Sequence, residues 1–217
     1  PVCNTPAYCT GEAAGHAMTL LVSLARKIHL ILPETRAGAW DYNFTKPVFG
    51  FRDKVLGIVG LGRIGRALVP KAKGFGIRVC AYDPYLDDDL FALLGIERRY
   101  ELDELLAESD YVSLHVPLTV ETHGMIGARE LGCMKESAVI INTARGPLWD
   151  EQAVEEAVRQ RRIAGAATDV MTNEPPPPDH PFLSLERMIV TPHVAWYSEE
   201  SFQKNMADGM DKIIRVL

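Results

Sequence analysis

The chain contains 217 residues, of which 47% are hydrophobic and 24% charged, and these proportions are typical of an ordinary globular protein. Its 23 lysine and arginine residues and 29 aspartate and glutamate residues give a formal net charge of −6. This balance argues against nucleic-acid binding, which needs cations that displace phosphate counterions. No apolar run approaches the length that crosses a membrane, so we do not expect the chain to span one. From the charge balance and the apolar runs together, we expect neither nucleic-acid nor membrane partners. The basic pairs Arg98-Arg99 and Arg161-Arg162 are isolated and are interpreted as solvated faces.

The four cysteines, Cys3, Cys9, Cys80 and Cys133, form no C-x-x-C pair and have few histidines nearby. We therefore predict neither a disulfide framework nor a metal site. The N-terminus lacks a charged segment leading into an apolar one, which argues against a signal peptide and makes a reducing cytoplasm the expected compartment. The absence of an initial Met suggests a processed, trimmed or truncated chain.

Short apolar runs alternate with helical patterns along most of the chain. Strands are predicted at 55–59, 77–82, 111–116, 139–142, 164–169 and 188–190, with helices from the turn after the first strand to about 73 and near 87–94, 102–107, 127–134 and 150–160. Runs such as Val139-Ile140-Ile141 are apolar throughout, which is typical of strands covered on both faces. The alternation predicts an α/β fold with a doubly wound parallel sheet.

Two long helices are predicted on either side of this block. The first covers residues 10–29, with Thr10 as its N-cap, and its apolar face must cover either the chain's own core or a partner subunit. The second covers residues 198–217. Within the block, Pro70 predicts a kink or a shortened helix, and Pro175–Pro178 predict a stiff surface loop.

Gly60, Gly62 and Gly65 form a G-x-G-x-x-G pattern between a predicted strand and a predicted helix. In a dinucleotide-binding fold the first glycine permits a tight turn, the second lets a pyrophosphate approach the backbone, and the third allows close packing of helix on strand. The helix N-terminus then offers unpaired N–H groups to the phosphates. Arg63, inside the pattern, either contacts the pyrophosphate or faces solvent.

Asp83 ends the second predicted strand, 18 residues after Gly65. A carboxylate at this place accepts hydrogen bonds from the adenosine ribose hydroxyls and repels a 2′-phosphate, which favours NAD over NADP. The alternative interpretation is that Asp83-Pro84 only begins a turn.

Polar residues follow each of the later predicted strands. They are His115 in the stretch His115-Val-Pro117, Thr143 to Gly146 with Arg145, Asp169 with Glu174, and Thr191 to His193. Since the carboxyl ends of parallel strands share one edge of a sheet, an arginine, a pair of carboxylates and a histidine there make a plausible catalytic set. Each has a structural alternative: a surface ion pair for Arg145, a solvated loop for Glu174 and a structural hydrogen bond for His193.

Together these stretches resemble the NAD-binding domain of the D-isomer-specific 2-hydroxyacid dehydrogenases. The matching segments are residues 4–6, 57–65, 73–76, 114–119, 142–146, 169–170 with 174–175, and 191–193. Residues 82–86 and 193–199 further resemble the branch that contains the C-terminal-binding-protein corepressors, with phosphoglycerate dehydrogenase a close cousin.

The resemblance implies an NAD-dependent oxidoreductase that transfers a hydride between NAD(H) and a 2-hydroxy or 2-keto acid of D configuration. Arg145 is then expected to hold the substrate carboxylate through two parallel hydrogen bonds, His193 to exchange the hydroxyl proton, and Glu174 to orient the imidazole. Asp169 is expected to accept from the nicotinamide carboxamide, and Trp196 to border the substrate pocket. The full set of implied cofactor-binding residues is Gly60, Gly62, Arg63, Ile64, Gly65, Asp83, Pro117, Thr122, Thr143, Ala144, Arg145, Asp169, His193 and Trp196.

Members of this family have two domains, and the substrate domain precedes the point where this sequence starts, so we expect it to be largely missing here. The resemblance implies a hinge and dimer-arm helix over 1–30, a Rossmann NAD-binding core over 31–197, and a C-terminal crossing helix over 198–217. It also implies a homodimer to which the helix at 10–29 contributes.

Two other functions stay open at this point. One is an NAD(H)-sensing dimeric scaffold related to corepressors, with little or no turnover. The other is a Rossmann domain for a different nucleotide, such as S-adenosylmethionine. The complete set of Arg145, Glu174 and His193 favours the enzyme over the scaffold, and the glycine pattern followed by Asp83 at dinucleotide spacing disfavours the other nucleotide.

Overall fold

The computed structural model describes residues 4–216, so Cys3 and the extreme ends of the predicted segments 1–30 and 198–217 lie outside the described residues. Seven parallel strands form one sheet in the order β3-β2-β1-β4-β5-β6-β7. The chain starts in the middle of the sheet, moves out to β3, returns to β4 beside β1 and continues to β7, which is the topology of a doubly wound fold. The predicted α/β class is confirmed. The strands are β1 (Val55–Val59), β2 (Arg78–Tyr82), β3 (Glu97–Arg99), β4 (Tyr111–Leu114), β5 (Val139–Asn142), β6 (Gly165–Thr168) and β7 (Met188–Val190).

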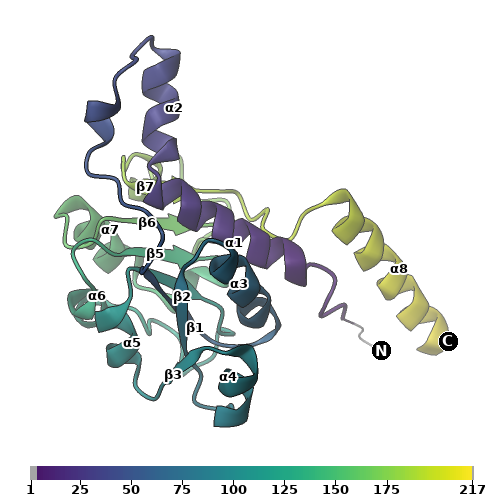
Figure 1. Cartoon of the computed structure of the whole chain (residues 1–217). Coiled ribbons are helices and arrows are strands. Elements are labelled where there is room, and N and C mark those ends of the chain that lie inside the picture. Colours follow the sequence, from purple (N-terminus) through teal and green to yellow (C-terminus); the bar gives the residue numbers. More distant parts are fainter. Residues whose placement is uncertain (1–3, 217) are drawn as a thin grey trace.

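Helices cover both faces of the sheet (Figure 1). Leu56 and Ile58 of β1 belong to the core under α1, α3 and α4, whereas Val55 and Val59 belong to the core under α5, α6 and α7. Successive side chains of a strand point to opposite faces, so one apolar strand supplies both cores. The helices are α1 (Thr10–Ala25), α2 (Ile28–Arg36), α3 (Arg63–Gly74), α4 (Asp88–Leu94), α5 (Leu102–Glu108), α6 (Ala128–Cys133), α7 (Glu151–Arg159) and α8 (Glu199–Val216), with short 3-10 helices η1 (Tyr42–Thr45), η2 (Gly146–Leu148) and η3 (Pro181–Leu183).

Helix α1 covers the chain's own sheet. Of the two alternatives for its apolar face, the chain's own core and a partner subunit, the structure shows the first. Ala14, Ala17 and Leu21 are at most 1% exposed and pack with α3, β5 and β6. The helix ends at Ala25, because Lys27 adopts the left-handed backbone conformation (φ 53°). A single helix over 10–29 is therefore wrong, and Cys9 rather than Thr10 is the N-cap.

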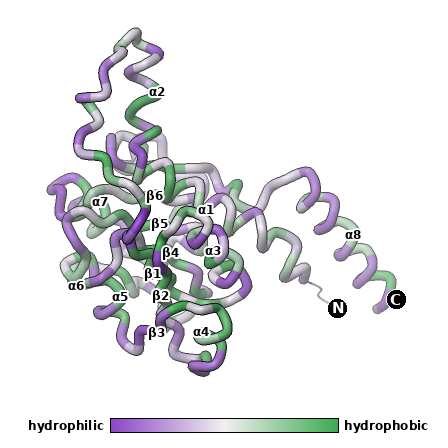
Figure 2. Tube along the Cα trace, viewed as in Figure 1, coloured by the Kyte–Doolittle hydropathy of each residue, from purple (hydrophilic) through white to green (hydrophobic). Residues whose placement is uncertain are grey.

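Residues 28–49, which we call the arm, project from the body of the protein (Figure 1). None of the nine residues of α2 is buried. The arm carries large apolar side chains that are exposed to solvent. Hydrophobic residues lie along α2 where it projects from the body (Figure 2). These side chains are Ile28, Leu32, Trp40, Tyr42, Phe44 and Phe49.

The edge strand β3 is missed by the sequence prediction, because its residues Glu97, Arg98 and Arg99 are all charged. Arg98 pairs with Asp88 at 2.6 Å, and Arg99 pairs with Glu97 at 2.6 Å and with Glu108 at 2.7 Å. The interpretation of Arg98-Arg99 as a solvated face is therefore wrong. Charged residues on an edge strand also oppose pairing with another sheet.

Two further expectations are each contradicted in one part. Helix α3 continues through Pro70 to Gly74, so the helix is not shortened; Pro70 lies on its exposed side. Arg162, the second residue of the other basic pair, donates from its guanidinium to the carbonyls of Met134 (3.0 Å) and Gly132, so only Arg161 of that pair is exposed.

Candidate active site

The glycine turn joins β1 to α3 at the carboxyl edge of the sheet. Gly60 has a φ of 91°, and a Cβ there would lie 2.7 Å from Val116 Cγ1; a Cβ at Gly65 would lie 2.3 Å from the carbonyl oxygen of Gly60. Packing therefore requires both glycines. A Cβ at Gly62 would meet nothing within 4 Å, so this residue borders an open space in front of the unpaired N–H groups of the first turn of α3. That space suits a phosphate group.

Asp83 ties the end of β2 to this turn. Its Oδ2 accepts from the N–H of Leu61 at 2.9 Å, and its Oδ1 accepts from the N–H of Tyr85 at 3.1 Å. Asp83 thus begins a turn, as one interpretation had it, and it also stands beside the glycine loop. An ionised carboxylate has about four acceptor sites, so the two oxygens keep capacity for ribose hydroxyls.

A cavity of about 490 Å³ lies next to the glycine turn. Six of the residues that line it are predicted cofactor-binding residues: Arg63, Ile64, Pro117, Thr143, Ala144 and Arg145. The hydroxyl of Thr143 is buried and has no hydrogen-bond partner within the described part of the chain. A buried hydroxyl without a partner is costly unless a ligand or water pairs with it, so this group and the open space at Gly62 both fit a bound dinucleotide.

Other lining residues were not predicted as site residues. Pro6, Cys9 and Thr10 line the cavity from the start of the chain, and His115 and Leu118 line it beside Pro117. Pro6 belongs to the matching segment 4–6, but nothing in the sequence placed it, Cys9 or Thr10 at the cavity, because their position depends on how the start of the chain and α1 pack. The position of His115 at the end of a strand was the signal that could have added it.

Thr122 contributes differently from the prediction. Its Oγ1 donates to the carbonyl of Pro117 at 2.6 Å and accepts from the N–H of Thr119 at 2.8 Å. It therefore shapes the loop after β4, and it is not among the residues that line the cavity.

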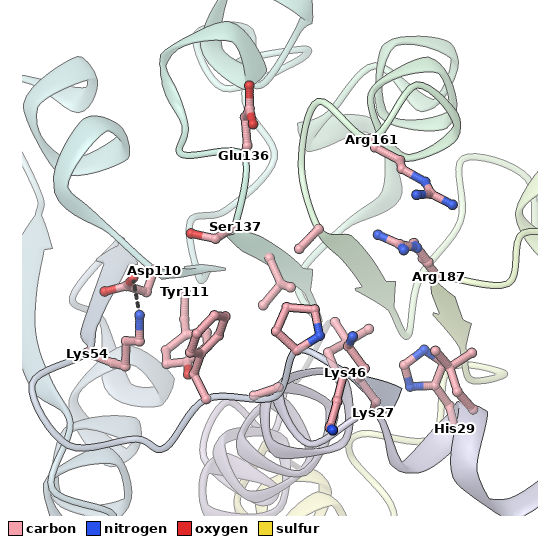
Figure 3. Close-up of a pocket in the computed structure, with 17 residues that line it drawn as sticks. Lys27, His29, Lys46, Lys54, Asp110, Tyr111, Glu136, Ser137, Arg161 and Arg187 are labelled. Carbon is pink, nitrogen blue, oxygen red and sulfur yellow. Dashed lines mark hydrogen bonds and ion pairs between the residues drawn. The ribbon is translucent and has the colours of Figure 1, made fainter. Parts of the chain in front are cut away.

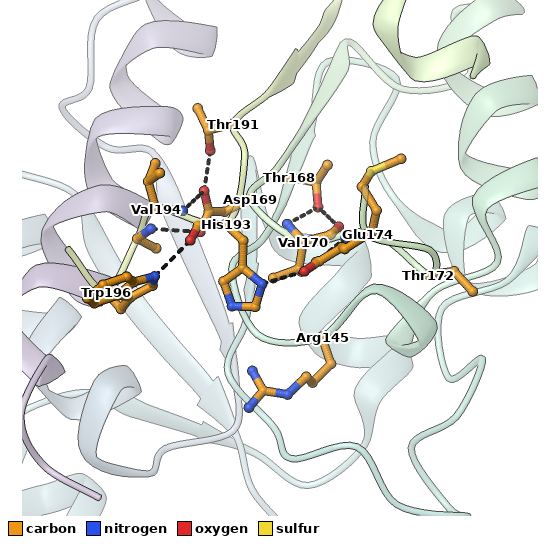
Figure 4. A network of polar contacts seen from close by, with 12 residues as sticks. Arg145, Thr168, Asp169, Val170, Thr172, Glu174, Thr191, His193, Val194 and Trp196 are labelled. Carbon is orange, nitrogen blue, oxygen red and sulfur yellow. Dashed lines mark hydrogen bonds and ion pairs between the residues drawn. The ribbon is translucent and has the colours of Figure 1, made fainter. Parts of the chain in front are cut away.

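The structure brings Arg145, Glu174 and His193 together (Figure 4). Nδ1 of His193 lies 2.6 Å from Oε2 of Glu174, and Oε1 of Glu174 accepts from the N–H of Met171 at 2.9 Å. Burial raises the pKa of Glu174, but the hydrogen bonds from His193 and Met171 and the charges of His193 and Arg145 outweigh it, so the pKa lies below its ordinary value. The arginine, after β5, donates to the carbonyl of Ala144 at 2.6 Å.

Asp169 is enclosed beneath the segment that carries His193. Its Oδ1 accepts from the hydroxyl of Thr191 at 2.5 Å and from the N–H of Val194 at 3.0 Å, and its Oδ2 accepts from the N–H of Ala195 at 2.7 Å. These bonds hold His193 at a left-handed φ of 55°. The expected contact of Asp169 with a nicotinamide stays a prediction, because the carboxylate is fully buried behind these donors.

Trp196 lies on the other side of the same turn. Its indole N–H donates to the carbonyl of His193 at 2.9 Å, and its ring centroid lies 6.3 Å from that of Tyr8. The indole of Trp196 is therefore fixed against the backbone of His193, and its role at the border of the substrate pocket stays a prediction.

A second cavity, of about 530 Å³, opens at the opposite edge of the sheet (Figure 3). Lys27, Lys46, Lys54, Arg161 and Arg187 line it, and Lys54 pairs with Asp110 at 3.1 Å. None of the predicted site residues lies there. Since ligands of open α/β sheets bind at the carboxyl ends of the strands, the smaller cavity is the candidate site.

The remaining expectations concern metals, disulfides and membranes. Within residues 4–216, no three His, Cys, Asp or Glu side chains are grouped as metal ligands would be, and no helix is long and apolar enough to cross a membrane. Cys9, Cys80 and Cys133 are free thiols.

Comparison with known proteins gives concordant matches. The family model of the D-isomer specific 2-hydroxyacid dehydrogenase, NAD binding domain, matches residues 18–195. A glyoxylate reductase of Korarchaeum cryptofilum is 42% identical over 203 residues, which cover 92% of this chain and 61% of that protein. The chain thus spans less than two thirds of that relative.

Two solved structures are similar over nearly the whole chain. An acyclic imino acid reductase in complex with NADPH and D-Arg has a TM-score of 0.86 and 33% identity, covering 96% of this chain and 65% of that protein. A D-lactate dehydrogenase from Aquifex aeolicus complexed with NAD and lactic acid has a TM-score of 0.87 and 30% identity, covering 96% of this chain and 67% of that protein.

Proposed function

The chain belongs to the D-isomer-specific 2-hydroxyacid dehydrogenase family, and from this premise we propose that it provides the NAD-binding half of an enzyme that transfers a hydride between NAD(H) and a 2-hydroxy or 2-keto acid of D configuration. The observation that carries the proposal is the pairing of His193 with Glu174 beside Arg145, at the edge of the sheet that also holds the glycine turn. Asp83 supports NAD rather than NADP as the preferred dinucleotide.

Each member of this trio has a separate task. When bound, NAD(H) supplies or accepts the hydride. Arg145 holds the substrate carboxylate with its planar guanidinium, which can donate two parallel hydrogen bonds. Because Glu174 occupies Nδ1 of His193, Nε2 is the nitrogen left for the substrate. It gives a proton to the carbonyl oxygen of the keto acid during reduction and takes the hydroxyl proton during oxidation. The anionic Glu174 stabilises the imidazolium and fixes the ring orientation.

The test is NADH oxidation by the complete protein with a panel of 2-keto acids, comparing the parent with His193→Ala. We expect kcat to fall by roughly 10²–10⁴-fold, the usual contribution of a general acid, while the variant still binds NADH. NADH binding without turnover on any acid of the panel would instead favour the NAD(H)-sensing scaffold. An active His193→Ala variant would contradict the role of the imidazole.

We further propose that the complete protein is a homodimer held by the arm. A helix of nine residues with no buried side chain is marginal by itself and needs a cover. A second copy supplies one, because a two-fold axis brings the same apolar side chains of both arms into one interface. Helix α1, which the resemblance placed in the interface, is already covered by its own sheet over its apolar face.

A cytoplasmic location is also part of the proposal. The free thiols of Cys9, Cys80 and Cys133 support a reducing compartment, because thiols of secreted proteins are usually paired.

A further inference from the structure

The loop that carries Glu174 is fixed from behind by a second carboxylate. Two consecutive backbone N–H groups of this loop each donate to a glutamate: Met171 to Glu174 Oε1 at 2.9 Å, and Thr172 to Glu151 Oε1 at 2.8 Å. Glu151 is the first residue of α7, so it belongs to a different element from the loop. The loop is thereby attached to a helix that is packed on the sheet.

Glu151 is itself held in place by His180. Nε2 of His180 lies 3.4 Å from Oε2 of Glu151. Nδ1 of His180 accepts from the N–H of Phe182 at 3.3 Å, so the ring hydrogen is on Nε2, and this nitrogen is the one in electrostatic contact with the carboxylate. The imidazole also packs edge-on against Phe182, with ring centroids 5.0 Å apart. The side chains of Glu151 and His180 are only 19% and 16% exposed.

The same loop lies directly on the backbone that follows Arg145. A Cβ at Gly146 would lie 2.2 Å from the carbonyl carbon of Met171, so the absence of a side chain at 146 allows this contact. Movement of residues 171–174 therefore changes the position of Glu174 relative to both Arg145 and His193. A carboxylate that fixes Thr172 consequently acts on all three members of the trio.

We propose that Glu151, oriented by His180, is a positioning residue for the Glu174–His193 pair. It touches neither substrate nor cofactor; it holds the loop at the place where Glu174 reaches Nδ1 of His193. The inference rests on the proposed function, in which that pair exchanges the substrate proton. The ionisable groups around His193 are Glu174, Arg145 and Asp169, with His16 behind Asp169, and all remain in the variants below.

The test compares Glu151→Ala with Glu151→Gln in the complete protein. Loss of the hydrogen bond to Thr172 in Glu151→Ala is expected to lower kcat about tenfold, as removal of one such bond does, with KM for NADH nearly unchanged. The decline of reduction rate at high pH should also begin at lower pH, because a displaced Glu174 stabilises the imidazolium less. Glu151→Gln keeps an oxygen for Thr172 and should recover most of the rate.

A matched control is Glu155→Ala, which removes the same charge one turn along α7, where Glu155 pairs only with the exposed Arg159 within the described residues. It should behave as the parent. If Glu151→Ala fails to fold, His180→Gln tests the same link and should give a smaller shift in the same direction. A pH profile of Glu151→Ala that overlays the parent, or a loss that Gln does not recover, would overturn the proposal.

Failure of the proposed function is distinguishable from failure of this inference. The protonation of His193 can be followed by NMR with NADH bound and no turnover. If the complete protein reduces no keto acid, a titration midpoint of His193 that moves to lower pH in Glu151→Ala still supports the positioning role. A midpoint equal to that of the parent and of Glu155→Ala contradicts it.

Discussion

His115, directly after β4, should make the free energy of unfolding depend on pH, because protonation of this imidazole is unfavourable in the folded state. Burial lowers its pKa from 6.5 to about 4, and Nε2 lies 2.8 Å from the hydroxyl of Ser113. The folded state therefore keeps the imidazole neutral, whereas the unfolded chain binds a proton below about pH 6.5. The unfolded state binds more protons in this range, so stability is highest above pH 6.5 and falls as the pH drops towards 4.

Replacement of this histidine by an uncharged residue should remove that loss. Between pH 7 and pH 5 we expect the parent to lose roughly 1–2 kcal/mol more unfolding free energy than His115→Gln, because the other titrating groups are common to both proteins. Urea unfolding at the two pH values measures the difference. Equal losses in parent and variant would mean that the imidazole is protonated in the folded state.

The role of a residue was predictable from the sequence where its position after a strand determined it. Arg145, Glu174 and His193 follow different strands, and the common carboxyl edge of a parallel sheet brought them together as the sequence predicts. Thr122 and Asp169 were harder, because the side chain of Thr122 holds its own loop and that of Asp169 holds the segment after β7. The hydrogen-bond partner of a buried hydroxyl or carboxylate depends on tertiary contacts. Nothing in the neighbouring sequence indicates that partner.

At the scale of elements, the apolar runs predicted six of the seven strands, and the charged β3 could not be found from hydropathy. The break between α1 and α2 could not be found from the sequence pattern either. Leu24 and Ile28 continue the helical spacing across it, and Lys27 adopts a left-handed backbone without the glycine that usually marks a helix end. Periodicity therefore predicted one helix where packing produces two.

The glycine turn allows a prediction at this scale that separates binding from folding. A methyl group at Gly62 would enter open space without backbone strain, so Gly62→Ala should stay within about 1 kcal/mol of the parent in unfolding free energy while NADH affinity falls at least about tenfold. Gly65→Ala should instead lower stability by about 1–3 kcal/mol, because its Cβ would collide with the carbonyl of Gly60. Calorimetric NADH titration and urea unfolding measure both. Unchanged NADH affinity in Gly62→Ala would contradict the phosphate-binding role of this turn.

At the scale of the whole molecule, the sequence pattern predicted two long helices beside the nucleotide-binding core but not the projecting arm. Exposure is a property of the assembled fold: Leu32 and Trp40 are large apolar residues, yet they are 48% and 93% exposed. Helix α8 also projects from the body beside the N-terminal segment (Figure 1), joined to it by Thr5 with Asn205 and Lys212 with Asn4. The role of this helix as a crossing between domains stays a prediction.

The exposed arm gives the last prediction, which concerns self-association. If a second copy covers the arm, then Leu32→Glu places a charge in an apolar interface and should weaken dimerisation at least about 100-fold, as loss of a central apolar contact does. Leu93→Glu on α4 is the matched control, because it makes the same substitution at a side chain that is 82% exposed and far from the arm in sequence and structure. Sedimentation equilibrium of the complete protein across a range of concentrations measures the dissociation constant. A parent that is monomeric at high concentration, or a Leu32→Glu variant that dimerises as well as Leu93→Glu, would show that something other than a second copy covers these side chains.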